Sequence, residues 1–66
     1  MKWFLNQHYD TLVSETGSII EKDDENITFL GHPDSTLITL YSNKDQLYID
    51  RMFEKLVNHL NPLALF

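Results

Sequence analysis

The chain has 66 residues and no cysteine, so packing alone must hold its fold together. The absence of cysteine excludes disulfide scaffolds, thiol nucleophiles, iron–sulfur clusters and thiolate zinc sites. This length allows one domain, which we expect to span residues 1–66. For so small a core, the free energy gained by burying apolar surface is about equal to the conformational free energy lost on folding. We therefore expect further burial in an oligomer, most simply a homodimer, or in a complex.

Hydrophobic residues make up 42% of the chain and charged residues 23%, with only two glycines and two prolines. This balance is too apolar, and too poor in residues that break secondary structure, for a disordered chain. The apolar run at residues 3–5 is too short for a secretion signal, and no run is long enough to cross a membrane. We therefore expect a folded cytoplasmic protein without a membrane partner.

The segment from Phe4 to Thr16 carries apolar or partly apolar side chains at steps of one and three residues. This spacing favours an amphipathic helix that ends at Gly17. A strand interpretation stays open because four large side chains also share odd-numbered positions, namely Trp3, Leu5, Tyr9 and Val13.

Residues 18–22 and 27–30 are rich in β-branched and aromatic side chains and flank the polar residues 23–26, which predicts two short strands around a loop. The tetrad His32-Pro33-Asp34-Ser35 predicts a type I turn, and residues 36–41 predict the strand that completes a hairpin.

The clearest pattern predicts a helix that ends at Asn61-Pro62, because six apolar residues repeat at helical spacing: Ile49, Met52, Phe53, Leu56, Val57 and Leu60. Either Ser42 or Asn43 is expected to cap its start.

The predicted fold class is therefore α+β, with the order α-β-β-β-α and a three-stranded antiparallel sheet that carries both helices on one face. We expect four alternating residues to face the helices, namely Ile27, Phe29, Ile38 and Leu40. Three apolar residues then face the other way and form a candidate interface: Leu30, Leu37 and Tyr41. Double-stranded-RNA-binding domains share this element order, but here the second helix begins with one Lys beside one Asp, which does not suit RNA.

Ten acidic residues outnumber five basic ones, and the formal net charge is −5. Direct nucleic-acid binding needs a clustered basic surface, which this composition does not supply. Six of the acids fall between residues 10 and 25: Asp10, Glu15, Glu21, Asp23, Asp24 and Glu25. They form either a solvated surface or an acidic face that steers the chain toward a basic protein, with carboxylates in place of phosphates. A cation site at residues 23–26 is disfavoured because the EF-hand spacing and its glycine are absent.

The sequence offers no candidate catalytic, metal or cofactor residues. His8, His32 and His59 fall on three different predicted elements, and no His pair has metal-binding spacing. The chain also lacks a nucleophile elbow and a glycine-rich phosphate loop. We therefore expect a protein that is not an enzyme and needs no cofactor.

These patterns favour a protein-binding module that engages and inhibits a larger protein with a basic, nucleic-acid-binding surface. Small acidic proteins that phages and mobile elements make against host defence systems act in this style. The alternative is a homo-oligomeric structural or regulatory subunit that acts through its apolar sheet face.

Overall fold

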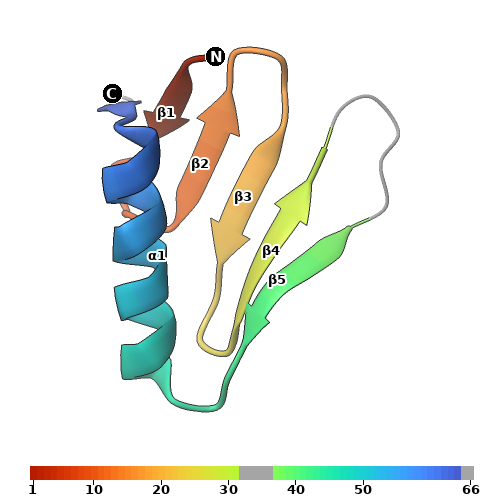
Figure 1. Cartoon of the computed structure of the whole chain (residues 1–66), viewed down its shortest axis with the longest axis vertical. Helices are drawn as coiled ribbons and strands as arrows, with labels where there is room; N and C mark the ends of the chain where they lie inside the picture. Colours follow the sequence, from red (N-terminus) through yellow and green to blue (C-terminus); the bar gives the residue numbers. More distant parts are fainter. Residues whose placement is uncertain (32–36, 65–66) are drawn as a thin grey trace.

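The computed structural model of the protein describes residues 1–31 and 37–64. Within these ranges the chain forms six strands, all in one sheet, and one helix (Figure 1). The strands are β1 (Trp3–Leu5), β2 (Thr11–Ser14), β3 (Ile19–Lys22), β4 (Asn26–Leu30), β5 (Ile38–Ser42) and β6 (Leu63–Ala64), and the helix is α1 (Gln46–Leu60).

The sheet has the strand order β5-β4-β3-β2-β1-β6. Strands β1 to β5 follow one another as an antiparallel meander, and β6 pairs with β1 in parallel. Helix α1 carries the chain back along one face of the sheet, so that the end of the described chain lies beside its beginning (Figure 1). The result is a small α+β domain with one sheet face covered and the other open.

The core lies between α1 and the covered face of the sheet. Six buried residues form it: Leu12, Ile20, Ile27, Ile49, Phe53 and Val57. The three helical members recur at every fourth position, and the three sheet members come from β2, β3 and β4. One helix therefore suffices to cover the middle of the sheet.

The predicted three-stranded sheet with two helices is wrong, because residues 3–14 form β1, a turn and β2 in place of a helix, and Leu63–Ala64 adds β6. In these strands Leu5 pairs with Leu12 on the covered face, whereas Phe4 pairs with Val13 on the open face. Strands that are apolar on both faces lose the alternation that marks a half-buried strand, and their runs of neighbouring apolar residues imitate helical spacing.

The turn between β1 and β2 is held by local hydrogen bonds. The Asn6 side-chain oxygen accepts hydrogen bonds from the backbone N–H groups of Asp10 and Thr11, each at 3.0 Å. Tyr9 takes a left-handed backbone conformation, with φ 60°. Gly17, expected to end a helix, instead sits in the turn between β2 and β3 at φ 93°, where glycine avoids the steric cost that other residues meet.

The predicted C-terminal helix is confirmed as α1. Its N-cap is Asp45, which accepts a hydrogen bond from the Leu47 backbone N–H at 3.0 Å, and not Ser42 or Asn43 as predicted. Asn43 lies just before the helix and holds the N-cap residue in place, because its side chain accepts a hydrogen bond from the Asp45 backbone N–H. The helix ends as predicted at Asn61, whose left-handed backbone allows its N–H to bond the Val57 carbonyl.

The predicted strands over residues 18–22, 27–30 and 36–41 correspond to β3, β4 and β5, which pair antiparallel in sequence order. The predicted turn at His32-Pro33-Asp34-Ser35 lies outside the described residues. Ile27 and Phe29 face the helix as predicted. Between these two residues, at Ile27–Thr28, the register between β4 and β5 shifts. Leu40 therefore has no partner on β4, and Tyr41, opposite Ile27, packs against the core.

Candidate functional site

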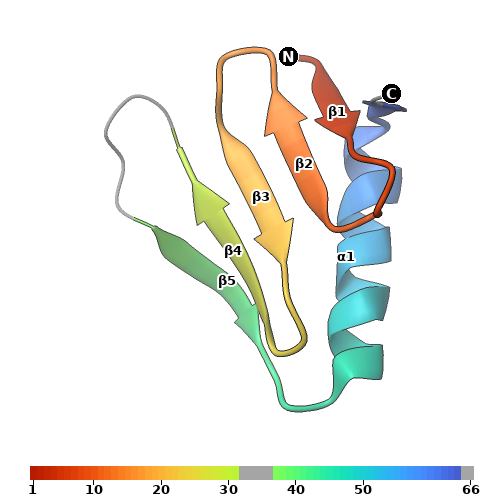
Figure 2. The same ribbon diagram turned by 180° about the vertical axis from the view of Figure 1, so that it is seen from behind.

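No element of the described structure covers the open face of the sheet, opposite α1 (Figure 2). One cross-strand row on this face is entirely apolar, and we call it the open-face row. Its members are Leu63, Phe4, Val13, Ile19 and Leu30, which stand next to one another on β6, β1, β2, β3 and β4. Leu30 and Leu63 are strongly exposed, and the other three are half-buried by their neighbours.

The row beside it is polar. Thr11, Glu21, Thr28 and Thr39 are registered with one another across β2, β3, β4 and β5. Glu21 is the only charged residue in the two rows. An apolar row edged by hydroxyl groups and one carboxylate is typical of a surface that contacts protein, because interface cores are apolar and poor in charge.

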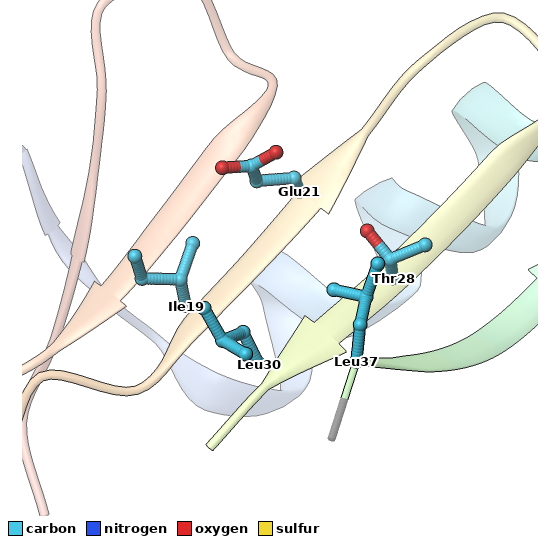
Figure 3. Close-up of a pocket in the computed structure, with 5 residues that line it drawn as sticks. All are labelled: Ile19, Glu21, Thr28, Leu30 and Leu37. Atoms are coloured by element: carbon cyan, nitrogen blue, oxygen red, sulfur yellow. The ribbon is translucent and has the colours of Figure 1, made fainter. Parts of the chain in front are cut away.

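A shallow hollow of about 180 Å³ joins the two rows at the β3–β5 end of the open face (Figure 3). Ile19, Leu30 and Leu37 supply its apolar walls, and Glu21 and Thr28 supply the polar atoms. The hollow can therefore hold a side chain with an apolar body, and the Glu21 carboxylate favours a cationic end group.

The structure brings five of the six predicted acidic residues to one end of the sheet. Glu21 lies near the end of β3, the β3–β4 turn carries Asp23, Asp24 and Glu25, and the Asp10 carbonyl accepts a hydrogen bond from the Lys22 backbone N–H at 2.8 Å. Glu15 lies in the β2–β3 turn at the opposite end, where its carboxylate accepts a hydrogen bond from the Lys2 backbone N–H. We call the group of five the acidic end.

Two carboxylates of the acidic end are fixed by hydrogen bonds. A hydrogen bond from the Asn6 amide, with a weaker one from the Thr11 hydroxyl, lowers the pKa of Asp10. The backbone N–H groups of Glu25 and Asn26 bond the Asp23 carboxylate at 2.8 and 2.7 Å and lower its pKa. These two carboxylates shape the turns. Asp10 is half-buried, whereas the other four residues of the acidic end are exposed.

The candidate apolar interface divides in the structure. Leu30 and Leu37 line the hollow on the open face, whereas Tyr41 packs against the core. Sequence reasoning missed Phe4, Val13, Ile19 and Leu63, although Ile19 and Ile20 are adjacent apolar residues in a short strand, and such a pair indicates that both faces of the strand are apolar.

Among residues 1–31 and 37–64, no group of three His or acidic side chains is placed to hold a metal ion. His8 and His59 lie apart on the β1–β2 turn and on α1, and His32 lies outside the described residues. In the same ranges, no helix has the length and apolar character that crossing a membrane requires. Comparison with protein-family models, curated proteins and solved structures finds no match.

Proposed function

We propose that this chain is a non-enzymatic protein-binding module that uses its open sheet face to hold a larger protein with a basic surface. The open-face row carries the proposal, because it places apolar side chains from five neighbouring strands on a face that no described element covers. Burial of such a row in a complex is favourable by about 25 cal/mol for each Å² of apolar surface removed from water.

The charge distribution favours a basic partner. The acidic end adjoins the hollow through Glu21, and the net charge of the chain is −5. Charges at the rim of an interface act mainly on the rate of association, because they steer the partner before contact is made. Basic protein surfaces commonly bind nucleic acid, so the inferred action is inhibition by occupation of such a surface, in the style of phage or mobile-element inhibitors.

The test uses two variants that place one lysine on different surfaces. Leu30→Lys puts a cation in the open-face row, and the matched control Leu47→Lys puts one on the exposed side of α1, where Leu47 is 59% exposed. A partner captured from cell extract by the immobilised parent chain is then purified, and its affinity for each variant is measured. We expect Leu30→Lys to weaken binding at least tenfold and Leu47→Lys to leave it unchanged. Equal affinities would refute the open face as the contact surface.

A third variant tests the steering role. Glu21→Gln, Asp24→Asn and Glu25→Gln together remove three of the four exposed charges of the acidic end and keep Asp23, which shapes its turn. We expect slower association and a smaller dependence of the rate on salt, with little change in dissociation. An unchanged association rate would mean that the acidic end only keeps the chain soluble.

A further inference from the structure

Strand β5 is an edge of the sheet. It pairs with β4 on one side, and no described strand lies on its other side. Proteins usually protect an edge with charged residues, proline, a bulge or a very short strand, because its free N–H and C=O groups can pair with another chain. Of these devices, β5 has only the register shift at Leu40. The segment 37–43 has no charged residue and no proline.

The opposite edge of the sheet is different. Strand β6 has two residues and directly follows Pro62, which has no backbone N–H to donate. A short strand of this kind offers little backbone for pairing. The protein therefore leaves the longer edge, β5, open for pairing.

Exposed apolar side chains gather at β5 on both faces of the sheet. Leu37 lines the hollow on the open face, and Ile38 is registered with Phe29, which faces the core. Ile38 is nevertheless 51% exposed, because the ends of β4 and β5 extend away from α1 (Figure 1). A partner that lay on one face could not cover both side chains, whereas a strand paired along the edge could.

We propose that β5 pairs antiparallel with β5 of a second copy of this chain. An antiparallel edge pair is related by a two-fold axis, so one strand is complementary to itself. With Thr39 at the axis, Ile38 of one copy lies opposite Leu40 of the other, an apolar pair of the kind that stabilises sheets.

The low charge of this edge permits contact between two copies. Each copy has a net charge of −5, so two copies repel unless they meet where the charge is low. The described residues from Asn26 to Asn43 carry no charged side chain, whereas four residues of the acidic end lie in the β1–β2 and β3–β4 turns and the fifth, Glu21, lies on β3, two strands away from β5. Strand β5 is thus an edge at which two acidic chains can approach without bringing charged side chains of that edge together, and it is longer than β6.

The dimer would present two open faces to a partner. The two-fold axis stands perpendicular to the joined sheet, so both helices lie on one side and both open faces on the other. Six strands about 4.8 Å apart and on average about four residues long present on the order of 400 Å². A standard interface buries about 800 Å² on each partner, so the two joined open faces together reach that size. Only this consequence rests on the proposed function, because the dimer itself needs no partner.

The experiment measures the mass of the purified chain by sedimentation equilibrium at about 50 µM. We expect twice the chain mass of 7.8 kDa. Ile38→Lys should weaken dimerisation at least tenfold. The matched control is Leu47→Lys on the exposed side of α1, where Leu47 is 59% exposed and the charge change is the same, and it should stay dimeric. Circular dichroism verifies that each variant is folded.

Amide hydrogen exchange of the unaltered chain gives a second readout that needs no variant. Exchange in residues 38–41 should slow as the concentration rises from about 1 µM to about 500 µM. A chain that stays monomeric at about 1 mM, with exchange independent of concentration, would overturn the proposal and show that the β5 register shift protects this edge. A dimer that Leu30→Lys dissociates and Ile38→Lys does not would assign the contact to the open face and would also overturn it.

Discussion

The Lys22 ammonium donates a hydrogen bond to the Asp50 carboxylate at 2.9 Å and so connects β3 to α1. The same ammonium lies 5.5 Å from the centre of the Phe53 ring. Lys22 pairs with Ile27 across β3 and β4, so its side chain lies on the covered face. Its aliphatic stem covers the edge of the core next to the acidic end. Lys22 therefore contributes both packing and charge.

These two contributions can be separated by substitution. Lys22→Met keeps most of the stem and removes the charge, and we expect it to lower the free energy of unfolding by no more than about 1 kcal/mol, because partly exposed ion pairs contribute little. Lys22→Ala also removes the stem and should cost at least about 1 kcal/mol more. Urea denaturation measures both values. Equal losses in the two variants would contradict a packing role for the stem.

Phe53 lies at the centre of the core and is fully buried. Phe53→Ala should lower the free energy of unfolding by about 3–5 kcal/mol. That loss is comparable with the whole stability of about 3–10 kcal/mol expected for a domain of this size, so the variant should be largely unfolded at 37 °C. Leu47→Ala on the exposed side of the same helix is the control and should change stability by no more than about 0.5 kcal/mol. A melting temperature of Phe53→Ala within a few degrees of the parent would contradict this packing.

Asp10 should make stability depend on pH in the acid range. The Asn6 amide lowers the pKa of Asp10 in the folded chain below the ordinary value of 3.8. A group with a lowered folded pKa stabilises the fold at pH values above its unfolded pKa, and this stabilisation is lost as the pH falls through the folded pKa. Acidification from pH 5 to pH 3 should therefore lower the urea midpoint less in Asp10→Asn than in the parent. Equal decreases would show that Asp10 does not contribute.

The sequence was sufficient to predict α1 because only one side of this helix is buried, and a single buried side produces the helical period of Ile49, Phe53 and Val57. Strands β3, β4 and β5 were predictable from their β-branched residues and the polar loop between the first two. Strands β1 and β2 were not, because Phe4 and Val13 make the open face as apolar as the covered one.

The open-face row could be predicted only in part. Alternation within the hairpin predicts that Leu30, a member of the row, and Leu37, which lines the hollow, face away from the helix. The other members of the row depend on the register of four other strands, which local sequence does not specify. The register shift in β5 turns Tyr41 to the core, and alternation alone cannot reveal such a shift. The acidic end was more predictable, because residues 21–25 are contiguous, whereas Glu15 lies one strand length away in the opposite turn.

Tyr9 combines a backbone cost with a packing gain. Its φ of 60° lies in the left-handed region, which costs a residue other than glycine about 1–2 kcal/mol. Its ring meets Phe53 edge-on, with the ring centres 5.8 Å apart, a contact that contributes about 0.5–1.5 kcal/mol. Tyr9→Ala loses the contact and keeps the cost, whereas Tyr9→Gly loses the contact and relieves the cost.

We therefore expect Tyr9→Gly to be more stable than Tyr9→Ala by about 1 kcal/mol in urea denaturation, which reverses the usual order of these two residues. Gln7, an exposed residue of the same turn without a positive φ, provides the control pair. There the alanine variant should be at least as stable as the glycine variant, because glycine loses more conformational entropy on folding. If Tyr9→Ala equals or exceeds Tyr9→Gly, the left-handed turn at Tyr9 does not form, and the pairing of β1 with β2 that depends on it must be different.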